Sequence, residues 1–180
     1  MPAHNRRTFL TTTTASMMAY LFSDLVQPPG SPAAVQENWR WCPKCECLWF
    51  HGHPAKGVCP AGGTHVSGPS PDYKLTVDGP TAHQQANWRS CPQCACLWFQ
   101  GSPTQGACPA GGTHASTGSG DYSLTLNAPA AGQQEDWRWC VKCAALWYNG
   151  SPSSGLCPAR GSHKASSRSV CSGNYALFYS

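Results

Sequence analysis

The feature of this sequence that most constrains its fold is a unit of 49 residues that occurs three times. Each copy contains the pattern W-R-x-C-x-x-C-x-x-L-W-[FY]-x-G, then G-x-C-P-A-x-G-[ST]-H, and finally Y-x-L. The copies span residues 36–84, 85–133 and 134–180. In the third copy the last tyrosine, Tyr175, comes four residues late, after an insertion that includes Cys171. A repeat of this length predicts one small structural unit built three times.

Short segments rich in aromatic and β-branched residues alternate with clusters of glycine and proline in each copy. This composition is typical of short strands joined by tight turns, and the chain after residue 34 shows no helical periodicity. For the first copy we expect four strands, at residues 39–42, 47–50, 57–59 and 73–77. Three copies of about four strands favour an all-β, pseudo-threefold fold that resembles a β-trefoil. The alternative is an array of three tandem zinc-ribbon-like units joined by polar linkers.

Cysteine and histidine recur in every copy with the spacing Cys-x2-Cys-x13-Cys-x5-His. Three thiolates and one imidazole, supplied by two short turns, suit a tetrahedral zinc ion. Four protein ligands leave no coordination position open for water, so the sequence predicts three structural zinc ions per chain. The predicted ligands are Cys42, Cys45, Cys59 and His65; Cys91, Cys94, Cys108 and His114; and Cys140, Cys143, Cys157 and His163.

Disulfide bonds are the alternative to zinc. The first 34 residues predict export, as described below, and an exported protein with an even number of cysteines, here 12, usually forms disulfides. Each copy has a fourth cysteine, but its place varies. Cys47 and Cys96 are equivalent, whereas the third copy has Ala145 at that position and carries Cys171 instead. A pseudo-threefold fold would bring Cys47 and Cys96 together as a candidate disulfide. The set that recurs unchanged is three cysteines and one histidine, which favours zinc.

The repeated aromatic residues are expected mainly in the core, because so small a unit has few other residues to bury. Within a strand, Trp49 and Phe50 would point to opposite faces. One aromatic residue of this pair, in each copy, is therefore a candidate for an exposed contact. Trp41 and Trp139 occupy a position where the second copy has Ser90, so we interpret this as an optional surface position.

The sequence lacks the motifs that carry common catalytic chemistry: G-x-S-x-G, H-E-x-x-H, a phosphate-binding loop and G-x-G-x-x-G. Its few carboxylates are not paired in the way a glycosidase requires. We therefore expect a binding protein and not an enzyme. A threefold repeat can present equivalent sugar sites, and the candidate carbohydrate-binding residues are Asp72, Tyr73, Asp121 and Tyr122.

The first 34 residues predict export. Arg6 and Arg7 are followed one residue later by Phe9 and Leu10 and then by a mildly apolar run, which resembles a twin-arginine export signal. With this signal removed, residues 35–180 are expected to form a secreted, extracellular protein. No later segment reaches the roughly twenty apolar residues that a membrane span needs. The net charge of +4 includes both leader arginines, so no nucleic-acid partner is expected.

The combined motif, W-R-x-C-x-x-C-x-x-L-W-[FY] with G-x-C-P-A-G-G-T-H, resembles Cys/Trp-rich repeats of proteins that actinobacteria secrete. In size and repeat type the chain is similar to the small adaptor subunits of the umbrella toxin particles of Streptomyces. The resemblance covers residues 36–180 and implies scaffolding of an antibacterial particle, with a lectin-like subunit and a large toxin as partners. Departures of the third copy at Val141, Ala145 and Arg160 argue against identical partners for all three copies. The alternative function is a lectin or cell-wall carbohydrate-binding protein.

Overall fold

Within the residues that the structure describes, each copy of the repeat folds into three antiparallel strands. The computed structural model describes residues 33–166 and 173–180, so the predicted export signal lies almost entirely outside the described residues, as does Cys171. The first copy contains β1 (Ala34–Trp41), β2 (Leu48–Phe50) and β3 (Tyr73–Val77). The second contains β4 (Gln84–Ser90), β5 (Leu97–Phe99) and β6 (Tyr122–Leu126). The third contains β7 (Gln133–Trp139), β8 (Leu146–Tyr148) and β9 (Tyr175–Tyr179).

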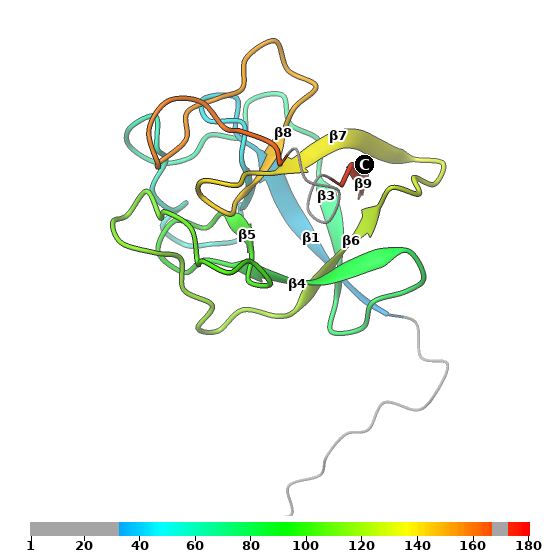
Figure 1. Ribbon diagram of the computed structural model, residues 1–180. Helices are drawn as coiled ribbons and strands as arrows, with labels where there is room; N and C mark the ends of the chain where they lie inside the picture. Colours follow the sequence, from blue (N-terminus) through cyan, green and yellow to red (C-terminus); the bar gives the residue numbers. More distant parts are fainter. Residues whose placement is uncertain (1–32, 167–172) are drawn as a thin grey trace, which may run out of the picture. The chain divides into compact units, whose positions relative to one another are not determined.

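The nine strands of the described residues form one antiparallel sheet that nearly closes on itself (Figure 1). Strands β3, β6 and β9 pair with one another, and each also pairs with the first strand of its own copy, β1, β4 or β7. That first strand forms a hairpin with the short strand that follows it. The threefold repetition of this pairing confirms the predicted all-β, trefoil-like fold. No helix in the described ranges is long and apolar enough to cross a membrane.

Two hydrophobic cores lie on the two sides of the short hairpin strands. Leu48 belongs to a barrel core that also buries Trp39, whereas Trp49 belongs to a second core formed around the cysteines. Successive residues of a strand point to opposite faces, so a strand covered on both sides needs apolar residues at consecutive positions. Phe50 packs on Trp39 with ring centroids 5.2 Å apart, and its counterpart Phe99 is only 9% exposed. In the second copy both aromatic residues of the pair are therefore buried, and the expected exposed aromatic residue is absent.

The expected strand at residues 57–59 is not formed, and the segment is a loop that packs on the next copy. Gly57 has a φ angle of 60°, and a Cβ atom at this position would lie 2.0 Å from the carbonyl oxygen of Cys94. Gly106 and Gly155 approach the third and first copies in the same way. The recurring G-x-C motif thus marks a contact between copies, which requires a residue without a side chain.

Backbone hydrogen bonds join the three copies in a ring. In each case the amide of the last residue of a short strand donates to the carbonyl of the residue after the Cys-x2-Cys turn of the next copy. The donor and acceptor pairs, each at 2.9 Å, are Phe50 and Ala95, Phe99 and Ala144, and Tyr148 and Glu46. The copies therefore share one sheet and interlocked loops, which is incompatible with three separate tandem zinc ribbons.

Candidate metal centres

The structure brings the predicted ligands together in three clusters, one in each copy. Within a cluster the three Sγ atoms and one imidazole nitrogen all lie within 4.8 Å of one another, and every residue is buried. The clusters are Cys42, Cys45, Cys59 and His65; Cys91, Cys94, Cys108 and His114; and Cys140, Cys143, Cys157 and His163.

The Cys-x2-Cys segment is a tight turn at the end of the first strand of each copy. In the first copy the carbonyl oxygen of Cys42 accepts hydrogen bonds from the amides of Cys45 (3.3 Å) and Glu46 (2.7 Å). Glu46 has a φ angle of 67°, and its counterparts Ala95 and Ala144 adopt the same left-handed conformation. The turn lets two sulfur atoms reach one cluster while the chain reverses immediately into β2.

A second turn supplies the other two ligands, Cys59 and His65. The amide of Cys59 donates to the carbonyl of Gly63 (2.8 Å), and the amide of Gly62 donates to the carbonyl of Cys59 (2.9 Å). Gly62 and Gly63 have φ angles of 93° and 65°, which residues with a side chain rarely adopt. In the third copy Arg160 takes the place of Gly62 with a φ angle of 73°, so the turn persists at a conformational cost.

A tryptophan holds the histidine of each cluster in position. Nδ1 of His65 lies 3.6 Å from Sγ of Cys45, while the ring of Trp49 stacks on the imidazole with centroids 5.4 Å apart. The same stacking, at 5.5 Å, occurs in the other two copies between Trp98 and His114 and between Trp147 and His163. The tryptophan of the repeated Leu-Trp pair therefore covers the histidine ligand.

The distances within the clusters fit a tetrahedral zinc ion. Zinc–sulfur bonds of about 2.3 Å and zinc–nitrogen bonds of about 2.0–2.1 Å place two sulfurs about 3.8 Å apart and a sulfur and a nitrogen about 3.6 Å apart. The sulfur pairs of Cys91 with Cys108 and of Cys140 with Cys157 are separated by 3.9 Å, and the sulfur–Nδ1 distances are 3.5–3.6 Å. No described cysteine forms a disulfide, whose sulfurs would lie about 2.05 Å apart. The clusters are thus consistent with three structural zinc sites.

Protons compete with a metal ion for these ligands. Hydrogen bonds from Cys45 and Cys59 lower the pKa of Cys42 far below its ordinary value. Contacts with Cys42 and Cys47 raise the pKa of Cys45 well above its ordinary value. Burial alone would lower the pKa of His65, but its contacts with Cys42 and Cys59 raise that pKa to about 9. A zinc ion that binds here must therefore displace protons at neutral pH.

The four ligands of each centre suit a metal ion with a structural role. Three sulfurs and one nitrogen from the chain satisfy the four-coordinate preference of zinc, so no position is left for a water or a substrate. A zinc ion bound in this way would join the two turns of each copy and contribute its binding free energy to folding.

Cys47 and Cys96 lie beside histidine ligands of neighbouring copies. Sγ of Cys96 is 3.3 Å from Nε2 of His65, and Sγ of Cys47 is 3.4 Å from Nε2 of His163. These nitrogens are the ones that do not face the histidine's own cluster. Hydrogen bonds to the second nitrogen of a metal-bound histidine fix its tautomer and ring orientation. The two thiols therefore connect metal centres to the adjoining copies.

Ala145 occupies the third equivalent position, and there the histidine lacks such a partner. Nε2 of His114 is buried and makes no hydrogen bond within the described residues. Cys47 and Cys96 are free thiols, so the candidate disulfide between them is not formed. Sequence reasoning missed the contact of these thiols with the histidines. Each of the two cysteines lies two residues after a predicted ligand, and this spacing was a usable signal.

The two aspartates considered for carbohydrate binding have structural partners. Asp72 forms an ion pair with Arg40 (2.6 Å) and accepts the amide hydrogen of Asn38 (2.7 Å), which lies at a bulge in β1. Partial burial acts to raise the pKa of Asp72, but Arg40 and the Asn38 amide outweigh it and lower that pKa below its ordinary value. Asp121 makes the equivalent contacts in the second copy, and Asn174 replaces the aspartate in the third.

The two tyrosines of the same candidate set belong to the barrel core. Tyr73 and Tyr122 are 2% and 4% exposed. The hydroxyl of Tyr122 donates to Oε1 of Gln36 (2.5 Å), and the hydroxyl of Tyr73 donates to Gln134. Burial raises the pKa of Tyr73. Neither ring offers an exposed platform for a sugar, although Tyr122 also lines a surface hollow between the first two copies.

No family model, curated protein or solved structure matches this chain. The zinc sites are accordingly identified by their own chemistry. Soft thiolate donors with one imidazole, the distances between them and their threefold repetition all agree with zinc in a closed site.

Proposed function

We propose that the protein is a secreted, non-catalytic adaptor that binds other proteins. Closed metal centres and repeated polar residues engaged within the fold support a binding role over a catalytic one. The similarity to adaptor subunits of umbrella toxin particles supplies candidate partners, a lectin-like subunit and a large toxin.

The observation that carries this proposal is an exposed apolar surface beside β3 and β9. Val35, Phe178 and Tyr179 are 58%, 45% and 49% exposed. With Lys74 and Thr76 they surround a hollow of about 310 Å³. We call these five residues the β3–β9 surface. They are neighbours in the sheet, because Lys74 pairs with Phe178 and Thr76 with Val35. Clustered apolar side chains at a surface are typical of protein interaction sites.

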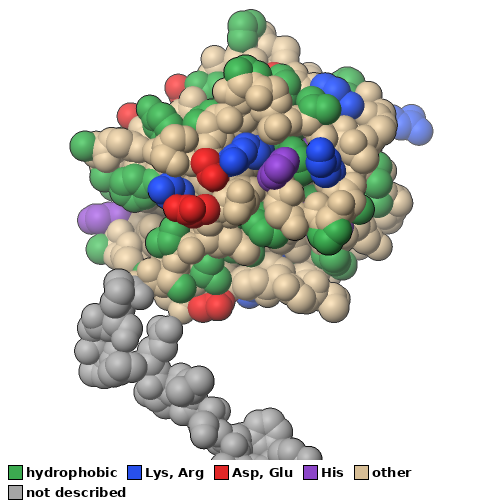
Figure 2. All heavy atoms as spheres, turned by 180° about the vertical axis from the view of Figure 1, so that it is seen from behind, with side chains coloured by type: hydrophobic (Ala, Val, Ile, Leu, Met, Phe, Trp, Pro, Cys, Tyr) green, Lys and Arg blue, Asp and Glu red, His purple; other side chains and the backbone are tan. Residues whose placement is uncertain are grey.

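The charge distribution also favours a protein partner over a nucleic acid. On the face shown in Figure 2, basic and acidic side chains lie interspersed, and no large area carries a single sign. Arg40 and Arg89 are paired with aspartates, and Lys74 is paired with Glu37. A balanced surface of this kind does not provide the basic stripe that a phosphate backbone requires.

The test is purification of the native protein from culture medium under mild conditions. We expect the wild type to elute in a complex and Phe178→Glu to elute alone, because a carboxylate buried in an apolar contact is strongly unfavourable. Leu156→Glu is the matched control, since Leu156 is 48% exposed but lies outside the β3–β9 surface. Elution of the wild type at monomer size would contradict the proposal. Retention of both variants on chitin or peptidoglycan would favour the carbohydrate-binding alternative.

A further inference from the structure

The position of Trp41 and Trp139 breaks the threefold pattern. The sequence predicted an optional surface position here, but Trp139 is only 7% exposed and Trp41 is partly buried, because both indoles pack against the barrel core. Trp41 of the first copy packs edge-on against Tyr148 of the third, with ring centroids 6.2 Å apart. Trp139 of the third copy packs in the same way against Phe99 of the second, at 6.3 Å. In each case an indole covers the aromatic residue that ends the preceding copy's hairpin. The third such contact would join the second copy to Phe50, but the second copy has serine there.

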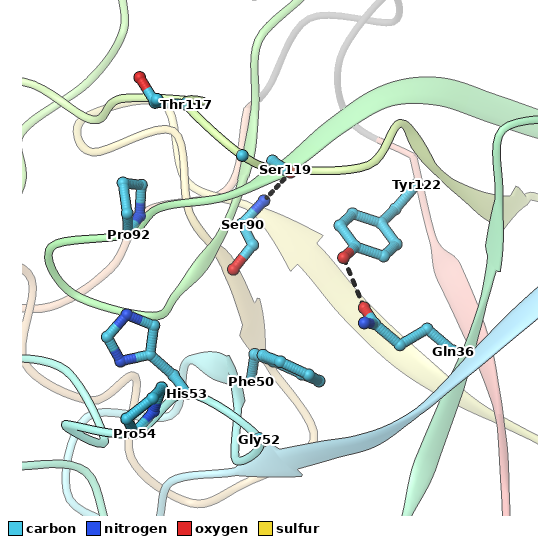
Figure 3. Close-up of a pocket in the computed structure, with 11 residues that line it drawn as sticks. Gln36, Phe50, Gly52, His53, Pro54, Ser90, Pro92, Thr117, Ser119 and Tyr122 are labelled. Carbon is cyan, nitrogen blue, oxygen red and sulfur yellow. Dashed lines mark hydrogen bonds between the residues drawn. The ribbon is translucent and has the colours of Figure 1, made fainter.

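At that place the surface is hollow. Ser90 and Phe50 line a cavity of about 190 Å³, together with Gln36, His53, Ser119 and Tyr122. In Figure 3 the residues of the first copy lie along the lower side of this cavity and those of the second copy along the upper side. The hollow thus lies at the junction between the first and second copies. At each of the two related junctions, the equivalent space is filled by an indole.

The walls of the hollow are held by hydrogen bonds within the protein. The amide of Ser90 donates to Oγ of Ser119 (2.8 Å), and the hydroxyl of Tyr122 donates to Gln36 (2.5 Å). The ring of Phe50 lies against Gly52, where a Cβ atom would be 2.5 Å from the ring. A preformed site of this kind loses little conformational entropy when a ligand binds.

We propose that this hollow receives an aromatic side chain of indole size from a partner protein. The occupant is indicated by the chain itself, because Trp41 and Trp139 show which group fits against the aromatic residue at each equivalent junction. The described lining contains no lysine, arginine, aspartate or glutamate, so a neutral ring is the appropriate ligand. Offset or edge-on packing on Phe50 would stabilise it, as such packing does between aromatic pairs in general. The inference rests on the proposed adaptor function and names one anchor of the partner.

The first test is a titration of the zinc-loaded protein with N-acetyl-tryptophanamide, followed by NMR of the backbone amides. We expect saturable shifts at Gly52, Ser90 and Ser119, and we expect Ser90→Trp to weaken binding about tenfold or more by filling the hollow. No saturable shift at these amides, or equal binding by Ser90→Trp, overturns the inference. So does saturable binding of N-acetylglucosamine in place of the indole.

Trp139→Ser is the matched converse variant, because it should open a second hollow beside Phe99. Trp139 suits this purpose because its indole nitrogen makes no hydrogen bond among the described residues, whereas that of Trp41 donates to Glu46 at 2.6 Å. The number of binding sites for the probe is expected to rise from one to two. A folded Trp139→Ser protein that still binds one equivalent at the original hollow would overturn the assignment of indole size. Zinc content shows that each variant is folded.

Partner capture separates this inference from the adaptor function itself. Ser90→Trp should lose the partner that the wild type retains during purification. If Ser90→Trp retains it fully, the adaptor function stands and the indole anchor is refuted. If the wild type binds the probe but elutes alone, the adaptor function is refuted, and the ring-binding site is supported by the titration.

Discussion

Sγ of Cys96 lies 3.3 Å from Nε2 of His65, so a residue of the second copy contacts a metal ligand of the first. Nδ1 of the same ring faces Cys45 in its own cluster. When Nδ1 binds a metal, Nε2 carries the proton and can donate it to the sulfur of Cys96. At two of the three metal centres, those of His65 and His163, the histidine ligand therefore also contacts a thiol of the neighbouring copy.

The three centres should differ in how firmly they hold zinc. His114 lacks the thiol partner that His65 and His163 have, because Ala145 stands at that position. Loss of a hydrogen bond to a metal-bound histidine typically lowers metal affinity about 10–100-fold. In competition with a chromophoric chelator, one zinc ion per chain should leave before the other two.

Two variants test this order of release. Cys96→Ala should make a second ion labile, whereas Ala145→Cys should bring the labile ion to the level of the others. If all three sites of the wild-type protein have the same affinity for zinc, the contact between thiol and histidine has no effect on the metal.

Removal of zinc should unfold the protein. Each centre ties together two turns, and no other cross-link joins them among the described residues. Metal analysis is expected to find about three zinc ions per chain, and a strong chelator should abolish the β-sheet signal in circular dichroism. Readdition of zinc should restore that signal. Persistence of the sheet after complete metal removal would show that the centres are not structural.

Zinc affinity should increase with pH across the neutral range. The pKa of His65 is raised to about 9 and that of Cys45 is raised above its ordinary value, so both hold protons that zinc must displace. Lower pH favours the protonated ligands and promotes release, whereas higher pH removes the competition. The dissociation constant for zinc, corrected for protonation of the competing chelator, is expected to fall throughout the range from about pH 5 to about pH 9. A corrected dissociation constant that is independent of pH would contradict proton displacement.

Periodicity in the sequence predicted the metal ligands, because Cys42, Cys45, Cys59 and His65 recur at constant spacing and a closed zinc site needs only those atoms. It also predicted the strands that carry the repeated aromatic residues. The contacts between copies were not predictable, since nothing in the sequence connects Gly57 with the carbonyl of Cys94. The predicted strand at residues 57–59 was wrong for this reason: the segment meets its partner through a left-handed glycine and not through a β-ladder.

Asp72 should act mainly as an acceptor for the bulge amide of Asn38 and only secondarily as a charge. Asp72→Asn imitates the third copy, where Asn174 accepts the equivalent amide, and should cost about 0.2–1 kcal/mol of unfolding free energy through loss of the Arg40 pair. Asp72→Ala also removes the acceptor of the Asn38 amide. Because this hydrogen bond is exposed, the additional cost should be about 0.5–1.5 kcal/mol. Denaturant unfolding measures both. Equal destabilisation by the two variants would mean that charge dominates.

Gly57→Ala should destabilise the fold although it adds only one methyl group. That group would lie 2.0 Å from the carbonyl oxygen of Cys94, in the turn that supplies the second copy's zinc ligands, at a φ angle of 60°. Left-handed strain and overpacking together predict a loss of roughly 2–5 kcal/mol in unfolding free energy. Gly79→Ala is the control, because a Cβ atom there meets nothing within 4 Å. If denaturant unfolding gives the same stability for both variants, the loop of one copy does not pack on the metal turn of the next.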